Sequence, residues 1–288
     1  MKYHIIANPV AGKKTSSKNL EIVKNVLNER GVDYEIHLSH AERDATEIAR
    51  RLTEAGATEL IALGGDGTLH EVLNGIINPQ TCRLGLVPSG TGNDFAERLG
   101  LPLDAAKAMH LILDGEAKPV NYLEVGGVRC MNVAGLGMDV DVLERCKKGK
   151  MKGKPKYLLS LVQSLFAFKG YKVKIECEGA EQERDVLIAA ACNGSQFGGG
   201  IQICPTAQVD DDKLNAVIVD CIGGKWKIIK AFIQLLKGKI LEYPATTHFL
   251  CERLTFVPQT PCTVQLDGEL YQNLDFTVEI KKGLCFYA

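Results

Sequence analysis

The sequence of 288 residues has almost no net charge, because 34 lysines and arginines stand against 35 aspartates and glutamates. It offers no global electrostatic case for nucleic-acid binding, so we expect no nucleic-acid partner. No apolar run approaches the roughly 18–20 residues that are needed to span a bilayer. The first residues also lack the charged and apolar segments of a secretion signal. Together these absences favour a cytoplasmic protein.

The chain contains ten cysteines, but it has no Cys-x-x-Cys pair and no group of cysteine and histidine at zinc-binding spacing. The cysteines are scattered singly along a chain that is long enough to bury a core of its own. We therefore expect reduced, largely buried thiols rather than a disulfide framework.

Apolar runs and helical stripes alternate over residues 1–120, which we take as the first domain. The expected strands are Tyr3–Ala7, Tyr34–Leu38, Leu60–Leu63 and Leu84–Val87, and the helical stripes lie at 20–27, 45–52, 69–77 and 104–113. Repeated strand–helix units predict an α/β domain whose parallel sheet carries helices on both faces.

Residues 121–288 have a different pattern and form the second expected domain, with the last strand a candidate to return to the first. The expected strands are Asn121–Val125, Val128–Val133, Lys172–Cys177, Val186–Cys192, Ala216–Cys221, Thr247–Phe256, Thr263–Leu266 and Phe276–Ile280. These strands predict an antiparallel β-sandwich. Helices are expected at roughly Tyr157–Phe168 and Lys225–Lys237, and the second carries Ile228, Ile229, Phe232, Leu235 and Leu236 on one side.

Two glycine-rich loops follow neighbouring strands of the first domain. Gly64–Thr68 follows the strand that ends at Leu63, and Pro88–Asp94 follows the strand that ends at Val87. Ligands of parallel sheets bind at the carboxyl ends of strands, so we expect one shared phosphate-binding crevice. Neither loop fits the P-loop or the dinucleotide fingerprint, which indicates a nucleotide site of another kind.

Four motifs occur in order along the chain: Asn8-Pro9 with Gly12-Lys13, the two glycine-rich loops, and Asp267-Gly268-Glu269. Together they resemble the catalytic region shared by diacylglycerol kinases and sphingosine kinases, in its compact soluble bacterial form. The resemblance covers essentially the whole chain. It implies a nucleotide-binding domain like that of NAD kinases and diacylglycerol kinases, followed by a β-sandwich, with the active site between them.

The resemblance implies that the first three motifs hold ATP. The implied nucleotide-binding residues are Asn8, Pro9, Gly12, Lys13, Gly64, Gly65, Asp66, Gly67, Thr68, Asn74, Ser89, Gly90, Thr91 and Asn93. A carboxylate beside phosphates is repulsive unless a cation intervenes, so we hypothesise that Asp66 helps to position Mg²⁺; alternatively, it braces its loop through backbone amides. Thr68 either caps the next helix or binds a phosphate oxygen. Asn74 either faces the nucleotide or is solvated.

By the same resemblance, Glu269 is the general base that accepts the proton of the attacking hydroxyl, and Asp267 supports it. Phosphoryl transfer otherwise needs positioning and charge neutralisation rather than covalent chemistry. An ordinary β-turn is the alternative for this motif. Asp94 corresponds to a position near the acceptor hydroxyl, or it is the N-cap of a short helix at Phe95–Leu99.

The family tends to hold a second, structural Mg²⁺ in an acidic loop, for which Asp211 and Asp210 are the candidates here. A solvated acidic turn is the alternative.

Three residues depart from the family pattern: Asp212 replaces a glycine, Asn121 replaces an aspartate, and Glu97 replaces an arginine. Asn121 cannot carry the negative charge of an aspartate, which argues against an efficient kinase unless another carboxylate such as Asp139 substitutes.

The segment Arg145–Lys156 carries seven positive side chains and no acid, and the apolar stretch Tyr157–Phe168 follows directly. The Lys147–Lys156 region is our candidate for docking on an anionic membrane surface, with a solvated loop as the alternative. A homodimer is left open.

We expect an ATP- and Mg²⁺-dependent lipid kinase, with diacylglycerol converted to phosphatidic acid as the leading reaction. The alternatives are another acceptor (a sphingoid base, another lipid alcohol or NAD) or a weakly catalytic protein that binds nucleotide or lipid.

Overall fold

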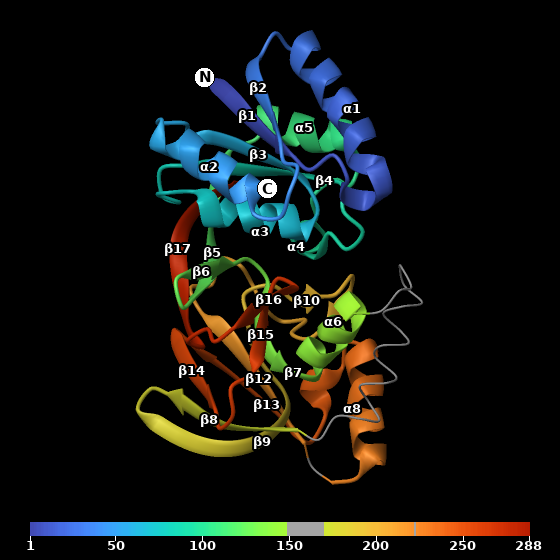
Figure 1. Ribbon diagram of the computed structural model, residues 1–288, viewed down its shortest axis with the longest axis vertical. Helices are drawn as coiled ribbons and strands as arrows, with labels where there is room; N and C mark the ends of the chain where they lie inside the picture. The colour runs from blue at the N-terminus through green and yellow to red at the C-terminus, as the bar shows by residue number, and fades with distance from the viewer. Residues whose placement is uncertain (149–169, 222) are drawn as a thin grey trace. The chain divides into compact units, whose positions relative to one another are not determined.

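The computed structural model describes residues 1–148, 170–221 and 223–288, without the side chains of Lys13, Lys14 and 146–148. The helix expected at Tyr157–Phe168 and most of the cationic run lie outside the described residues. The chain forms two compact units, one of Met1–Tyr122 with Lys282–Ala288 and one of Leu123–Lys281. Two strands pass from one unit into the other: β5 (Ala117–Val125) and β17 (Thr277–Tyr287) (Figure 1).

A parallel sheet forms the centre of unit 1, as expected from the alternation of strands and helices. Its strands run in the order β4 (Arg83–Pro88), β3 (Glu59–Gly64), β1 (Lys2–Ala7) and β2 (Asp33–Leu38). The three strands β4, β3 and β1 are mostly isoleucine, leucine, valine and alanine, which is typical of strands that are buried on both faces. The end of β17 pairs in parallel with β4, so the last strand does belong to this sheet.

Helices cover both faces of this sheet (Figure 1). The helices α1 (Thr15–Glu29) and α5 (Ala105–Asp114) pack together on the face that carries Ile5 and Ile61. The helices α2 (Asp44–Glu54) and α3 (Asp66–Gly75) pack together and against β1 and β3. Two short helices complete the unit: η1 (Ala11–Lys14) and α4 (Asp94–Leu99).

Unit 2 is the expected antiparallel β-sandwich. Its further elements are β6 (Val128–Cys130), β7 (Val133–Gly137), α6 (Met138–Lys148), β8 (Tyr171–Cys177), β9 (Ala180–Cys192), β10 (Gln196–Phe197), β11 (Ile201–Gln202), β12 (Leu214–Asp220), α8 (Lys225–Leu236), η2 (Ile240–Glu242), β13 (Thr246–Cys251), β14 (Arg253–Pro258), β15 (Thr263–Leu266) and β16 (Glu269–Gln272). The end of β9 lies between β7 and β12. One face of these strands packs against β14, β15 and β17, and the other packs against α6 and α8. No helix in the described part of the chain is long and apolar enough to cross a membrane.

Three expectations for unit 2 were wrong in detail. The runs expected as single strands at Val128–Val133 and Thr247–Phe256 each form two strands. The helix α6 was missed; Met138, Asp139, Val140 and Val142 are buried, and residues 141 and 143–145 are partly exposed, so the buried positions form no regular helical stripe. Leu236 and Ile229 do not share the buried side of α8, because Leu236 is 54% exposed and Ile229 is partly exposed, while Leu235 is 3% exposed. The cysteines that the structure describes are free thiols, as expected.

A buried carboxylate fixes the last strand in unit 1. Glu59 on β3 is 1% exposed, and it forms an ion pair with Arg83 on β4. Its other oxygen accepts a hydrogen bond of 2.8 Å from the Tyr287 hydroxyl on β17. Burial, together with this carboxylate, raises the pKa of Tyr287. A charge that is taken out of water needs such partners to be stable.

Tyr287→Phe is therefore expected to lower the free energy of unfolding by about 1.5–3 kcal/mol, the usual value of a hydrogen bond to a charged group. The control is Tyr34→Phe, whose hydroxyl bonds the side chain of Asn28 in an exposed position and which should cost less than about 0.5 kcal/mol. Urea denaturation of both variants measures the difference. Equal effects would show that the bond to Glu59 does not anchor the strand.

Candidate active site

The glycine-rich loops and the Asn8 turn lie together because three strands end at the same level. Ala7 pairs with Leu63, and Gly64 pairs with Pro88. The backbone pairing continues into the loops: Asn8 N–H donates to the Leu63 carbonyl oxygen at 3.2 Å, and Ser89 N–H donates to the Gly64 carbonyl oxygen at 2.7 Å. The carboxyl edge of the parallel sheet thus carries all three nucleotide motifs that the sequence predicted.

The loop backbones approach one another more closely than a side chain would allow. A Cβ atom on Gly90 would overlap the Cα of Gly65, and one on Gly65 would lie 2.9 Å from the Cα of Gly90. A Cβ on Gly12 would overlap the carbonyl oxygen of Ser89, and Gly12 also has a φ of +56°. Only glycine fits these positions without a shift of backbone. The glycines therefore bring the three loops into direct contact.

Polar side chains brace the second loop from within unit 1. Asn93 accepts from Gly90 N–H at 2.9 Å and donates to the Gly90 carbonyl at 3.2 Å. Asp66 Oδ1 accepts from Phe95 N–H at 3.2 Å, so Asp66 contacts a backbone amide of α4, after the second loop, rather than an amide of its own loop. Its role at Mg²⁺ stays a prediction.

A buried asparagine that the sequence analysis missed supports Ser89. Asn19 on α1 donates to Ser89 Oγ at 2.9 Å, and both residues are buried. Asn19 lies in the buried stripe of α1, which also contains Leu20 and Val23. A polar residue in an apolar stripe was the signal that could have identified it.

Thr68 and Asp94, which the sequence offered as helix caps, are not the N-cap residues of α3 and α4. Gly65 is the N-cap of α3, and Thr68 lies inside the first turn with its hydroxyl against Gly64. Asn93, with a φ of 56°, is the N-cap of α4, and Asp94 is the first helical residue. Asp94 is 5% exposed, which is rare for a carboxylate outside a functional or paired position.

The remaining residues of the predicted nucleotide site occupy less buried positions. Asn8 Oδ1 accepts from Val10 N–H at 3.1 Å, which shapes the turn after β1. Asn74 donates to the His70 carbonyl at 2.8 Å, a bond within its own helix. Pro9 and Gly67 are partly exposed, and Thr91 is exposed. The side chain of Lys13 lies outside the described atoms.

In unit 2, the motif Asp267-Gly268-Glu269 forms a tight hairpin turn. Leu266 on β15 pairs with Glu269 on β16, so Asp267 and Gly268 are the two loop residues. Their φ angles are +53° and +87°, as a type I′ turn requires, and Asp-Gly is a preferred sequence for this turn. The turn is thus an ordinary hairpin in geometry, and it fixes Glu269 at the first position of a strand.

The carboxylate of Asp267 anchors the turn to the segment between β6 and β7. It accepts from Met131 N–H at 2.8 Å and from Asn132 N–H at 2.7 Å, and the Cys130 thiol lies 3.1 Å away. Asn193 donates to the Met131 carbonyl at 2.7 Å from the other side. Hydrogen bonds to an ionised carboxylate are strong, so Asp267 holds Glu269 in place through the backbone.

A second carboxylate of unit 2, that of Asp139 on α6, lies next to the hairpin. Asp139 is 6% exposed, and neither of its oxygens has a hydrogen bond of normal geometry within the described residues. Burial raises the pKa of Asp139 to about 6, while the nearby Gln265 amide acts in the opposite direction. Gln265 Oε1 in turn accepts from Gly268 N–H at 2.9 Å. Asp139 is therefore packed against the residue that holds the turn.

The acidic loop that follows β11 contains the two aspartates predicted for the structural Mg²⁺. Asp211 Oδ1 accepts from Lys213 N–H at 3.1 Å, and Asp210 is exposed. Asp212 has a φ of +61°, so it adopts the conformation that the glycine usual in the family would supply. Aspartate tolerates this conformation better than most residues, which removes one objection from the sequence. A metal at this loop stays a prediction.

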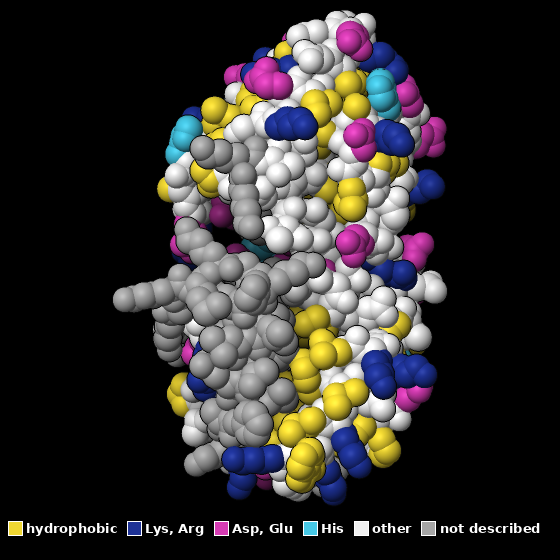
Figure 2. Space-filling model, turned by 90° about the vertical axis from the view of Figure 1, so that its right-hand side faces the viewer, with side chains coloured by type: hydrophobic (Ala, Val, Ile, Leu, Met, Phe, Trp, Pro, Cys, Tyr) yellow, Lys and Arg dark blue, Asp and Glu magenta, His cyan; other side chains and the backbone are white. Residues whose placement is uncertain are grey.

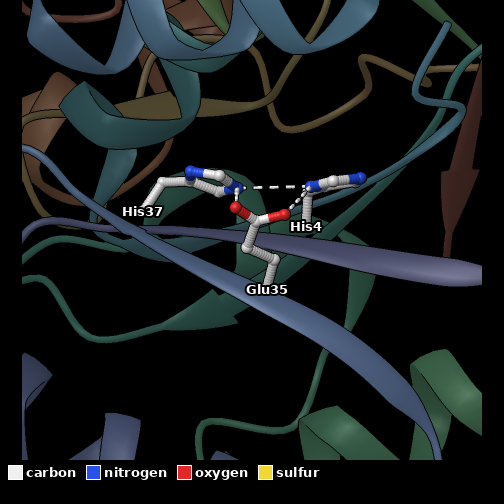
Figure 3. A group of neighbouring side chains, drawn as sticks. All are labelled: His4, Glu35 and His37. Carbon is white, nitrogen blue, oxygen red and sulfur yellow. Dashed lines mark hydrogen bonds and ion pairs between the residues drawn. The ribbon is translucent and has the colours of Figure 1, made fainter.

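A group of side chains with metal-ligand spacing lies elsewhere in unit 1 (Figure 3). His4, Glu35 and His37 project from β1 and β2 toward one another. His4 Nδ1 lies 3.2 Å from His37 Nε2, and Glu35 accepts from Lys2 Nζ at 2.9 Å. The donor atoms thus already have partners in the protein, and the group includes none of the residues predicted for Mg²⁺.

The contact between Gly12 and Ser89 predicts an unusually costly substitution. Gly12→Ala should lower the free energy of unfolding by about 1–2 kcal/mol for the left-handed conformation. The free energy of unfolding should fall by a further 1–3 kcal/mol or so, because the new methyl group would overlap the backbone carbonyl of Ser89. Gly100→Ala is the control, because Gly100 has a φ of +66° with open space around it. Urea denaturation of both variants decides, and equal losses would contradict the close approach.

Comparisons with known proteins agree with this arrangement. The diacylglycerol kinase catalytic domain model matches residues 2–125, and the YegS C-terminal NAD kinase beta sandwich-like domain model matches residues 132–284. A protein of Xanthomonas campestris pv. campestris named "Probable lipid kinase YegS-like" is 31% identical over 283 residues, which cover 93% of this chain and 90% of that protein.

Two relatives from Bacillus extend the comparison. The diacylglycerol kinase of Bacillus subtilis is 28% identical over 273 residues, which cover 92% of this chain and 88% of that protein. The crystal structure of a diacylglycerol kinase from Bacillus anthracis superposes with a TM-score of 0.81 at 26% identity, covering 99% of this chain and 96% of the other. The resemblance inferred from the four motifs is confirmed: this chain is a kinase that belongs to the diacylglycerol kinase catalytic-domain family of lipid kinases.

Proposed function

We propose that the enzyme transfers the γ-phosphoryl group of ATP to a lipid hydroxyl, with diacylglycerol converted to phosphatidic acid as the leading reaction. The observation that carries the proposal is the convergence of three loops at the carboxyl edge of the parallel sheet, where glycine contacts leave backbone amides close together. Such an edge is the usual ligand site of a parallel sheet, and amides at helix N-termini favour phosphate.

In this proposal the ATP phosphates bind the amides of residues 65–68 and 91–93, because the amides of Ser89 and Gly90 already donate to Gly64 and Asn93. The helix α3 begins at Asp66, so its N-terminal amides and dipole favour the added negative charge. Mg²⁺ would bind beside Asp66, because a hard cation offsets the repulsion between this carboxylate and the phosphates. Lys13, which lies in η1, is the lysine that we propose as a phosphate ligand. Asp94, at the start of α4, is proposed to bind the acceptor hydroxyl.

Glu269 is proposed as the base that accepts the hydroxyl proton. The type I′ turn and the bonds of Asp267 to backbone give Glu269 a fixed position, which general base catalysis requires. Asp267 has two amide partners, so we assign it to positioning rather than to proton transfer. The structural Mg²⁺ is proposed at Asp210 and Asp211. We further propose a cytoplasmic enzyme that associates with the membrane from its surface.

Phosphorylation of a lipid panel with labelled ATP tests the proposal. We expect diacylglycerol to be the preferred acceptor over a sphingoid base, another lipid alcohol and NAD. Labelled product from NAD alone, or binding of ATP with no labelled lipid, would overturn it.

Glu269→Gln is expected to reduce lipid phosphorylation by at least about 100-fold, a usual contribution of a general base, with nearly unchanged ATP affinity. Glu181→Gln, an exposed carboxylate on β9, is the matched control and should keep normal turnover. Turnover measured at saturating ATP and ATP affinity measured by calorimetry separate catalysis from binding. Equal turnover in the two variants would remove Glu269 from the reaction.

Asp139→Asn tests the buried carboxyl group beside the hairpin. The folded state raises the pKa of Asp139 to about 6, so it binds this proton more tightly than the unfolded chain does. The charged form therefore costs stability as the pH rises from about 4 to about 7. The variant should gain up to about 3 kcal/mol relative to the wild type at pH 8 compared with pH 4. The control is Asp141→Asn on the same helix, which removes an ion pair with Arg145, one turn later in the sequence. This variant should not show the gain in stability.

A further inference from the structure

The helix α8 carries apolar side chains on two sides, one buried and one exposed. Its inner face consists of Ile228, Ala231, Phe232 and Leu235, which pack on the sandwich strands with Val217 and Val219. Its outer face carries large apolar side chains in water: Trp226 is 78% exposed, Leu236 is 54% exposed and Ile233 is 42% exposed. The core of unit 2 explains only the inner face.

The outer residues form a continuous stripe rather than isolated positions. Trp226, Ile229, Ile233 and Leu236 follow one another at spacings of three and four residues, which places them along one side of the helix. A helix on a soluble surface normally has a polar outer face, and a larger apolar patch marks a binding surface.

Lysines border this stripe, and one of them, Lys239, lies 4.0 Å from the carboxylate of Glu242. Lys225, Lys227, Lys230, Lys237 and Lys239 are all exposed, and residues 221–241 contain no aspartate or glutamate. Figure 2 shows this face of unit 2, with hydrophobic side chains gathered over α8 and basic side chains around them. A chain with a net charge of −1 therefore carries a local basic surface on this helix.

An open groove extends the apolar surface beside the helix. It has a volume of about 630 Å³ and is bounded by Ile233 and Gln234 on α8 and by Tyr243, Pro244 and Ala245 after η2. Lys227 and Lys230 stand on its margin. The apolar lining with cationic margins can accept acyl chains and anionic headgroups together.

We propose that the outer face of α8 docks the protein on an anionic phospholipid bilayer, with Trp226, Ile233 and Leu236 in the interface and the lysines on the headgroups. Basic helices with tryptophan and aliphatic residues on one face bind membranes in this way. Lysine stems can cover apolar surface while their ammonium groups reach phosphates. The absence of any acid in residues 221–241 favours an anionic surface over a protein partner of mixed charge.

The tryptophan makes this proposal directly measurable, because the chain contains one tryptophan and it lies in the stripe. Fluorescence is recorded without ATP, as vesicles of phosphatidylcholine alone or with phosphatidylglycerol are added. We expect a blue shift with the anionic vesicles, quenching by brominated acyl chains, and little change with phosphatidylcholine alone. High salt should weaken the binding.

Matched variants distinguish the helix from other surfaces. The double variant Ile233→Ser with Leu236→Ser should weaken vesicle binding at least about tenfold, because the apolar surface of two side chains is no longer transferred from water into the bilayer. Lys227→Glu with Lys230→Glu should weaken it in the anionic vesicles. Leu250→Ser, a residue of β13 with 53% exposure, and Lys172→Glu on β8 are the controls and should bind normally.

Three results would overturn the proposal. The first is vesicle binding, seen by sedimentation, without a change of Trp226 emission. The second is equal binding by the α8 variants and their controls. The third is concentration-dependent self-association that Leu236→Ser abolishes, which would make α8 an interface between copies. Turnover of lipid dissolved in detergent micelles is expected to survive in the α8 variants, so docking and the proposed kinase reaction can fail separately.

Discussion

The direct contact between loop backbones at the end of the parallel sheet is the constraint on which the candidate nucleotide site depends. Gly65 and Gly90 touch at their Cα atoms, and Gly12 meets the carbonyl of Ser89. Without side chains at these positions, three loops can share one small region and direct their amides into it. The hydrogen bond from Asn19 to Ser89 and the hydrogen bond from Phe95 N–H to Asp66 hold the loops in this contact. The sheet thus positions the three loops, the glycines allow their backbones to come close, and the polar side chains hold them in place.

Local patterns in the sequence were sufficient for the parallel sheet, most of the sandwich and the convergence of the glycine-rich loops. They were sufficient because strand spacing and glycine placement are properties of short segments. The partners of Asp267 could not be predicted, since Met131 and Asn132 lie more than a hundred residues away in sequence and are joined only by the fold. The caps were misplaced because neither Gly65 nor Asn93 makes the side-chain hydrogen bond by which an N-cap is usually identified. The outward side of Leu236 was also missed, because an apolar residue at helical spacing indicates the core in most helices.

Unit 2 combines rigidity around a carboxylate with an unusual outer surface. The hairpin turn fixes Glu269 through backbone geometry, while Asp139 remains buried beside Gln265 at a cost in stability. Natural proteins retain such costs mainly where function requires them. The double-faced helix α8 follows the same logic, because its outer apolar stripe adds nothing to the core. Both features are understandable in a kinase whose acceptor is a lipid, and neither is needed for a stable sandwich.

The most direct measurement for the central claim is a crystal structure with a non-hydrolysable ATP analogue and Mg²⁺. The account predicts the phosphates within hydrogen-bond distance of the amides of residues 65–68 and 91–93, with the cation beside Asp66. Nucleotide bound away from these loops, with their amides still facing water, would contradict it.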